Sequence, residues 1–322
     1  MACECDPRLA TAPATFTLAG DVVKLGHRPG SLLPAATVIG LLLHHRGGQP
    51  LVDLETCRLF IDKLAITFDT AYARKLLTIV ANHGRTSTTK RPIYAHESRC
   101  GDVFVQHRPL PGSFASRTSR LEFNPATASP SDTKLVKRLV AIAKNIRISR
   151  VDVAIDVPVS IRRFQVLSST RQKVVTYSGP AGIETLYLGK RGADRQIRLY
   201  DRQKRLHERG HLPPCDGPLT RIEAELHHVR VSLSELASLK DPFSHLQLFD
   251  LSSGDLPLPQ ALLLNYARVF GLATLRDHLE RNEFVALVNA RPRSSLLPHP
   301  SAVFDQQWSG AVATLLRELN VP

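Results

Sequence analysis

The sequence has no apolar run long enough to cross a lipid bilayer. The longest such run, SLLPAATVIGLLL at residues 31–43, is shorter than the ~20 residues of a membrane helix and contains a proline and a glycine. The chain also opens without a basic segment followed by an apolar stretch, so no secretory signal is predicted. We therefore expect a cytoplasmic protein with no membrane partner.

Cysteine is scarce, with five residues in the chain, and an odd number argues against a disulfide framework. Only Cys3 and Cys5 lie close together in sequence, whereas Cys57, Cys100 and Cys215 stand alone. We expect all five to be reduced thiols. A metal clip formed by Cys3 and Cys5 is the alternative, although a frayed terminus is the more frequent explanation of such a pair.

Acidic residues are outnumbered by basic ones, 29 against 42, which gives a net charge of +13 and a pI near 9.9. Such an excess favours a polyanionic partner. The basic residues fall within strand-like and irregular segments and not along one face of a long amphipathic helix. Nucleic acid is therefore a better candidate partner than an anionic membrane surface.

The hydrophobic pattern predicts an α+β fold, with no internal repeat in the chain. Residues 1–56 lack a sustained period and are expected to form an irregular leader. Strands are predicted at residues 59–68, 102–109, 119–125, 148–159, 173–178, 184–191, 195–202 and 219–228, and helices at 71–84 and 129–145. We expect residues 57–250 to form a mostly antiparallel sheet covered by helices on one face, and residues 251–322 to form a smaller helical region.

Three of the predicted strands carry acids on the face opposite an apolar row. These acids are Glu122, Asp152, Asp156, Glu223 and Glu225. Carboxylates held close together suit a hard cation, Mg²⁺ or Mn²⁺, which prefers oxygen ligands and neutralises their charge. The alternative is that each acid pairs with a nearby arginine on the same face, for instance Arg150, Arg198 or Arg221.

A tyrosine lies in the middle of the basic segment RQIRLYDR. Strand alternation places three side chains on the face opposite its apolar row: Arg198, Tyr200 and Arg202. A phenol flanked by guanidinium groups suits a phosphoryl-transfer nucleophile, because the cations stabilise the phenolate and bind phosphate oxygens. The alternative is an ordinary amphipathic tyrosine on a half-exposed strand. Tyr177 and Tyr187 are weaker candidates of the same kind.

A series of motifs resembles a known family. IDKLAITF, RLEFNPA, ISRVDVAID, TLYLGKRGADRQIRLYDRQKR and TRIEAEL occur in this order within residues 59–232. The series is similar to rolling-circle replication initiators of the trans-acting plasmid type and to filamentous-phage replication endonucleases. The resemblance implies an enzyme that nicks one strand of a circular origin, keeps the 5′ phosphate on a tyrosine and leaves a 3′ hydroxyl as primer. It implies Tyr200 as the nucleophile and residues 57–250 as the nicking and joining domain.

The same resemblance implies the metal ligands and the phosphate contacts. Glu122, Asp152 and Glu223 would hold Mg²⁺ or Mn²⁺, with Asp156 and Glu225 as reserve ligands. The phosphate contacts would come from Lys190, Arg195, Arg198 and Lys204. Many rolling-circle enzymes hold their metal with a His-hydrophobe-His pair, which this sequence lacks. The plasmid subgroup uses acids, so the activity is still expected while the identity of the ligands stays open.

Other functions stay open beside replication initiation. A conjugative relaxase of the same fold, or a non-catalytic sequence-specific DNA-binding protein such as a repressor, would share much of this pattern. The expected partner is DNA, single-stranded at the nick, and a host helicase and a homodimer are left open. HERGH at residues 207–211 matches the zinc-protease motif H-E-x-x-H, but Gly210 and the following prolines would stop the helix that a zinc site needs.

Overall fold

The computed structural model describes most of the chain. It describes residues 16–18, 21–23, 54–70, 73–81, 85–86, 93–112, 115, 117–168, 173–180, 182–250, 259, 262–263, 266–267, 272–289 and 299–321. The chain divides into two compact units, residues 1–47 and 48–322. In the first unit, the short strands β1 (Phe16–Leu18) and β2 (Asp21–Val23) pair antiparallel. The rest of the expected irregular leader up to residue 53 lies outside the described residues.

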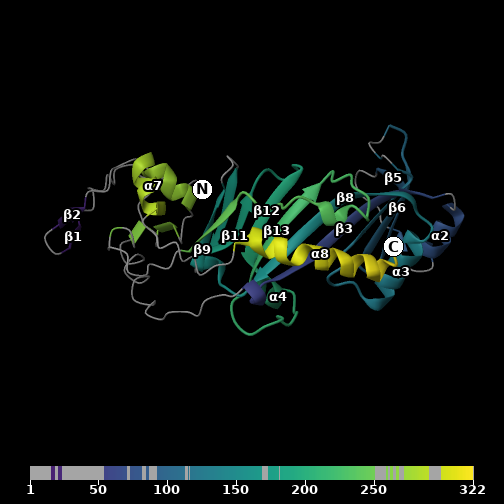
Figure 1. Cartoon of the computed structure of the whole chain (residues 1–322), viewed down its shortest axis with the longest axis horizontal. Coiled ribbons are helices and arrows are strands. Elements are labelled where there is room, and N and C mark those ends of the chain that lie inside the picture. The colour runs from purple at the N-terminus through teal and green to yellow at the C-terminus, as the bar shows by residue number, and fades with distance from the viewer. Residues whose placement is uncertain are drawn as a thin grey trace, which may run out of the picture. The chain divides into compact units, whose positions relative to one another are not determined.

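The second unit is built on a ten-stranded sheet in which every neighbouring pair is antiparallel (Figure 1). Its strands, in spatial order, are β10 (Val174–Gly179), β11 (Gly182–Leu188), β12 (Arg195–Asp201), β13 (Thr220–His227), β8 (Lys144–Val157), β3 (Arg58–Asp69), β7 (Ser119–Phe123), β6 (Val103–Pro109), β5 (Tyr94–Cys100) and β4 (Arg85–Thr86). A separate two-stranded ribbon joins β9 (Phe164–Ser168) to β14 (Leu246–Asp250). The expected α+β fold with a mostly antiparallel sheet is confirmed.

Helices α2 (Ala73–Ala81), α3 (Pro130–Val140) and α8 (Pro300–Leu319) form the helical layer of this unit. In Figure 1, α8 runs across the sheet, and it packs against β3 and α3, while α2 packs against α3 and β5. Helix α3 begins with the predicted Ser/Asp start: Ser129 and Asp132 form a reciprocal capping box. Further helical segments are α4 (Arg202–Glu208), α6 (Leu272–His278), α7 (Arg281–Asn289) and the short turns η1 (Leu54–Thr56), η2 (Ile161–Arg163) and η3 (Leu236–Ser238).

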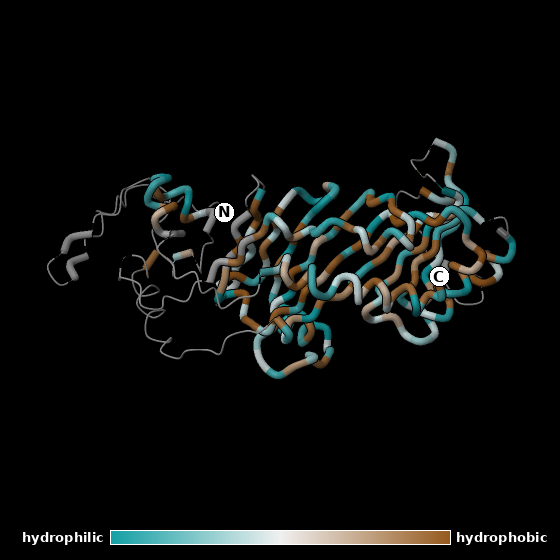
Figure 2. Tube along the Cα trace, in the orientation of Figure 1, coloured by the Kyte–Doolittle hydropathy of each residue, from teal (hydrophilic) through white to brown (hydrophobic). Residues whose placement is uncertain are grey.

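The core lies between the sheet and this helical layer. Hydrophobic and hydrophilic residues alternate along the strands (Figure 2), and one set of alternate side chains enters the core with the apolar stripes of α3 and α8. On β8 the predicted apolar row is buried there: Val151, Val153, Ile155 and Val157. The other face of β8 is not solvated, since Asp152, Ala154 and Asp156 are also buried. Any charge on that face therefore needs a partner within the protein.

The C-terminal helix belongs to the sheet unit. The Gln307 side chain accepts a hydrogen bond from the Leu59 amide at 2.8 Å and donates one to the Cys57 carbonyl at 2.9 Å, which ties α8 to the start of β3. Trp308 and Phe304 of α8 stack on each other and are buried in the core. The boundary expected near residue 250 is thus not a boundary between compact units, because the apolar face of α8 covers the sheet. No helix among the described residues is long and apolar enough to cross a membrane.

Candidate functional site

Tyr200 occupies the position that strand alternation predicts. On β12, Ile197 and Leu199 enter the core, so Arg198 and Tyr200 lie on the opposite face of the sheet. The strand ends at Asp201, whose side chain accepts a hydrogen bond from the Lys204 amide at 2.9 Å and caps α4. Arg202 was expected to share the face of Tyr200 as a strand residue. Only the strand assignment is wrong, because the cap at Asp201 makes residue 202 the first of α4; Arg202 still interacts electrostatically with Tyr200 and Asp156.

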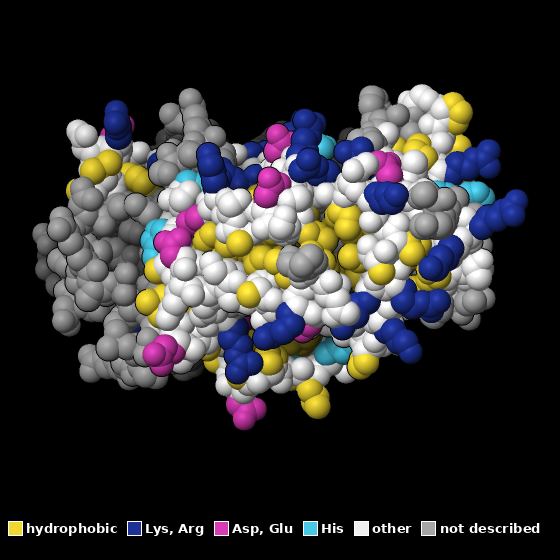
Figure 3. Space-filling model, turned by 45° about the vertical axis from the view of Figure 1, so that its right-hand side comes forward, with side chains coloured by type: hydrophobic (Ala, Val, Ile, Leu, Met, Phe, Trp, Pro, Cys, Tyr) yellow, Lys and Arg dark blue, Asp and Glu magenta, His cyan; other side chains and the backbone are white. Residues whose placement is uncertain are grey.

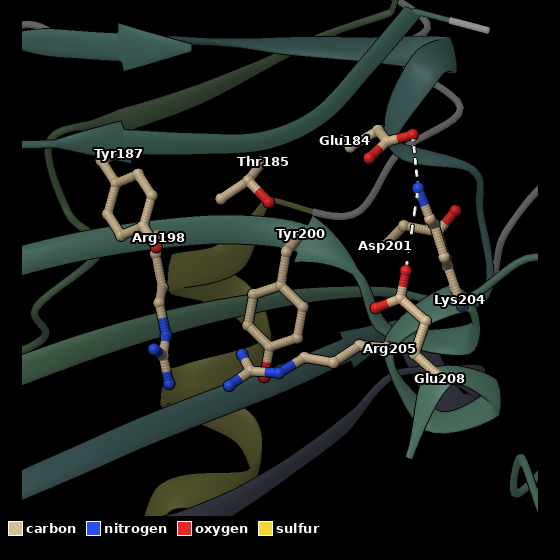
Figure 4. A pocket seen from close by; sticks show the side chains of 9 residues that line it. All are labelled: Glu184, Thr185, Tyr187, Arg198, Tyr200, Asp201, Lys204, Arg205 and Glu208. Carbon is tan, nitrogen blue, oxygen red and sulfur yellow. Dashed lines mark hydrogen bonds and ion pairs between the residues drawn. The ribbon is translucent and has the colours of Figure 1, made fainter. Parts of the chain in front are cut away.

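Tyr200 lies at a hollow of about 270 Å³ (Figure 4). The hollow is lined by residues of β11, β12 and α4: Glu184, Thr185, Tyr187, Arg198, Tyr200, Asp201, Lys204, Arg205 and Glu208. Helix α4 follows β12 directly and contacts β13, and its residues Lys204, Arg205 and Glu208 line the hollow of the tyrosine. The Lys204 ammonium lies 2.6 Å from a Glu184 oxygen and 3.9 Å from a Glu208 oxygen.

The Tyr200 phenol contacts a buried carboxylate and two guanidinium groups. Its hydroxyl lies 3.4 Å from Glu223 Oε2, and the side chain is 5% exposed. The Arg205 and Arg198 guanidinium carbons lie 4.7 Å and 5.3 Å from the centre of its ring. Burial, and then the Glu223 carboxylate, raise the pKa of Tyr200 by more than the nearby arginines lower it. The arginines act in the expected direction and favour the phenolate, whereas burial and the adjacent carboxylate favour the neutral phenol.

Glu223 connects the tyrosine to Arg198. It projects from β13 with no exposed surface, and β12–β13 pairing places it directly opposite Arg198, with which it forms an ion pair. Its second oxygen faces the Tyr200 hydroxyl. Since a neutral phenol needs a base to become a nucleophile, Glu223 has the position of a general base.

The next acids along the face are held by Arg150. Its guanidinium donates two hydrogen bonds of 2.7 Å to Asp152 and lies 3.0 Å from Glu225. Glu225 also lies 2.7 Å from the His227 ring. Burial raises the pKa of Asp152 to about 6, more than Arg150 lowers it, and the Glu223 and Glu225 carboxylates add to the rise.

The two outer acids are paired in the same way. Arg221 binds Asp156 with two hydrogen bonds of 2.7 and 2.8 Å and reaches Asp62 at 2.8 Å. Farther along the sheet, Glu122 forms ion pairs with Lys63 and Arg120, and these cations lower its pKa by more than burial raises it. Each predicted carboxylate therefore has a cationic partner in the protein.

The acids do not form a ready-made metal centre. Among the described residues, no group of three or more His, Cys, Asp or Glu side chains is placed to hold a metal ion. The alternative of acid–arginine pairing describes what the structure shows, with Arg150, Arg198 and Arg221 as the partners. A divalent ion would have to compete with guanidinium donors, so the ligand set inferred from the resemblance stays a prediction.

The predicted phosphate contacts are only partly brought together. Arg198 and Lys204 line the hollow, as does Arg205, which the sequence reasoning missed. Arg195 shares the side of Ile197 and Leu199 on β12, the face opposite Tyr200, and Lys190 follows β11 outside the hollow. The signal for Arg205 was Asp201, an N-cap residue that predicts the start of a helix directly after the strand.

The HERGH segment does not form the regular helix that the zinc-protease motif needs. Helix α4 ends at Glu208 with Arg209 as its C-cap, and Gly210 has a φ of +70°, in the left-handed region that stops a helix. His207 and His211 therefore do not share a regular helix, and the predicted helix stop at Gly210 is confirmed.

Comparisons with known proteins give similarities to solved structures alone. No family model and no curated protein matches the chain. A rolling circle replication initiator protein from Geobacillus stearothermophilus is similar in structure, with a TM-score of 0.36 and 18% identity over 54% of this chain and 76% of that chain. Nothing about activity follows from so low a similarity, so function has to be argued from the site.

Proposed function

We propose that this protein nicks and rejoins DNA with Tyr200 as the nucleophile. The contact of 3.4 Å between the Tyr200 hydroxyl and the buried Glu223 carboxylate supports the proposal most strongly. The proposed nucleophile and its proposed base thus lie together beside a hollow lined by three cations: Arg198, Lys204 and Arg205. This is the arrangement that transfer of a phosphoryl group to a hydroxyl requires.

The reaction follows from these positions. The Tyr200 hydroxyl gives its proton to Glu223, and the phenolate oxygen attacks the phosphorus of a phosphodiester. A bond from the tyrosine oxygen to phosphorus forms as the bond from phosphorus to the 3′ oxygen breaks, and the leaving oxygen takes up a proton. The product is a 5′-phosphotyrosine link and a free 3′ hydroxyl. One ester replaces another, so the 3′ hydroxyl can attack the link and reseal the strand.

Charge favours DNA as the partner at this site. The three cations of the hollow can meet the phosphate oxygens and the charge that develops on them during attack. On the face shown in Figure 3, Lys and Arg side chains are spread widely and Asp and Glu side chains are fewer, in keeping with a net charge of +13. Phosphate contacts of this kind make binding fall steeply with added salt.

We further propose that the substrate is the origin of a circular phage or plasmid replicon, as the motif resemblance implies, and that the nick starts rolling-circle replication. The test incubates the full chain with the supercoiled replicon that encodes it, in Mg²⁺ or Mn²⁺. Protein covalently attached to the 5′ end of the cut strand supports the proposal. Binding without cutting would favour the non-catalytic DNA-binding protein, and cutting only at a transfer origin would favour a relaxase.

Replacing Glu223 by glutamine is expected to slow nicking by roughly 10²–10⁴-fold, because the amide cannot accept the phenol proton. Single-turnover nicking rates of the variant and of the wild type measure the effect.

Glu225→Gln is the matched control for Glu223→Gln. It changes the same atoms two positions along β13, where the carboxylate contacts Arg150 and His227 instead of Tyr200. Urea unfolding of both variants checks that the fold is kept. An equal loss of rate in both variants would overturn the role of Glu223 as base and favour carboxylates that act as a set.

A divalent ion, Mg²⁺ or Mn²⁺, is proposed as a cofactor from the resemblance, and its removal tests the proposal. A Lewis acid at the phosphate contributes several kcal/mol, so chelation should slow nicking at least ~10²-fold, with recovery when the ion is restored. Nicking at full rate in the presence of chelator would show that the arginine-paired acids work without a metal.

A further inference from the structure

Two tyrosines lie beside the hollow without a role in the reaction above. Tyr177 belongs to β10, the edge strand of the sheet, and Tyr187 to β11. Their rings meet edge to face with centroids 5.8 Å apart. The Tyr177 side chain is 59% exposed, so its ring is accessible at the edge of the sheet.

Strand register places both rings on the face of Tyr200. β10 pairs Tyr177 with Thr185, and β11 pairs Thr185 with Tyr200. Tyr187 in turn pairs with Arg198. Side chains of directly paired residues share a face, so Tyr177 lies two strands, roughly 10 Å, from Tyr200 in one row. Figure 4 shows Tyr187, Arg198 and Tyr200 projecting the same way from adjacent strands.

The neighbourhood combines rings with cations. Tyr187 lines the hollow together with Arg198, Lys204 and Arg205, and Tyr177 extends this surface to the open edge of the sheet. Cations bind the backbone of a nucleic acid strand, whereas an unpaired base needs a flat apolar surface on which to stack. If a phosphate lies at Tyr200, the base next to it can therefore stack on the rings of Tyr187 on β11 and Tyr177 on β10.

We propose that Tyr187 and Tyr177 form a stacking site for an unpaired base of the DNA strand whose phosphate enters the hollow. The inference rests on the proposed function in that the hollow receives a single DNA strand. The site recognises the flat face of a base rather than its hydrogen-bonding edge, so it accepts single-stranded DNA and excludes a base held in a duplex. It positions the scissile phosphate and tolerates different base sequences.

The experiment measures binding in the full chain carrying Tyr200→Phe, so that cleavage does not intervene. The probe is a fluorescent oligothymidylate of about 16 nucleotides, the upper end of common site sizes on single strands, followed by fluorescence anisotropy. Tyr187→Leu and Tyr177→Leu, each added separately, should weaken binding roughly 10- to 100-fold, since each removes a ring and keeps an apolar side chain. Tyr187→Phe and Tyr177→Phe, which keep the ring, should bind as their parent does.

An abasic oligonucleotide of the same length separates stacking from phosphate contacts. All the tyrosine variants should bind it equally, and all should keep the parent's salt dependence, whereas Lys204→Gln should lower the salt slope by about one. Leucine variants that bind oligothymidylate like their parent, or that lose abasic binding to the same extent, would overturn the stacking site. So would a parent protein that binds neither oligonucleotide.

This experiment and the nicking assay can fail separately. Ring-dependent binding without any covalent adduct in the wild type would retain the stacking site and reject the proposed enzyme. A covalent adduct in the wild type, together with binding that does not depend on the two rings, would retain the proposed enzyme and reject the stacking site.

Discussion

Tyr200→Phe is expected to abolish the covalent protein–DNA adduct and to reduce nicking by more than about 10³-fold, the scale of losses when an enzyme's nucleophile is removed. The substitution deletes one oxygen and keeps the ring that lies near Arg198 and Arg205. Binding of DNA should therefore change little. The measurement is the yield of protein attached to the 5′ end of the nicked replicon, beside the fraction of replicon bound.

The matched control for this substitution is Tyr94→Phe. Tyr94 is a buried tyrosine of β5 in the same sheet, and it does not line the hollow of Tyr200. Tyr94→Phe removes one hydroxyl oxygen, as Tyr200→Phe does, and nicking should persist in this variant. If Tyr200→Phe still forms an adduct, another side chain is the nucleophile and the proposed reaction is wrong.

Arg221→Met is expected to destabilise the protein by about 3–5 kcal/mol, as breaking a buried ion pair does when one charge is left behind. Arg221 is 4% exposed, binds Asp156 and Asp62, and its guanidinium carbon lies 4.5 Å from the centre of the Phe60 ring. Methionine fills much of the space but leaves both carboxylates without their cation. The midpoint of urea unfolding, with the slope, gives the change in free energy.

Arg276→Met is the control for charge removal alone. Its side chain is 64% exposed and lies 4.0 Å from Asp277, so its loss should cost less than about 1 kcal/mol. Adding Asp156→Asn and Asp62→Asn to Arg221→Met should recover part of the lost stability, since no unpaired charge then remains. A loss below about 1 kcal/mol for Arg221→Met alone would contradict a buried pair.

The alternation of apolar and polar residues predicted a large part of the sheet. Local patterns were enough to predict the strands around Tyr200, the acids on β8 and β13, and the capped start of α3. Each of these depends on a period or motif within a few residues. Strands β1, β2, β4, β5, β9 and β14 were not predicted. On β5 the pattern is broken by the polar residues Glu97 and Arg99, so no clear apolar row marks the strand.

The local sequence pattern could not predict which side chains pair with one another across neighbouring strands. The sequence offered two readings of the acids, a metal site or arginine pairs, and only the register of β12, β13 and β8 shows Glu223 opposite Arg198 and Arg221 opposite Asp156. The burial of both faces of β8 was likewise hidden. Burial of Asp152 on β8, and of Tyr200 on β12, is the largest cause that raises their pKa values, and it outweighs the nearby arginines.

By itself the sequence determined the fold class, the basic character and the face of the strand on which Tyr200 lies, since these follow from composition and from a period of two. The tertiary structure decided which carboxylate faces the phenol, which cations reach it from α4, and that two further tyrosines share its face. The reason is physical: a strand's period fixes which way a side chain points, whereas its neighbours come from segments far apart in the chain, brought together by strand register and burial.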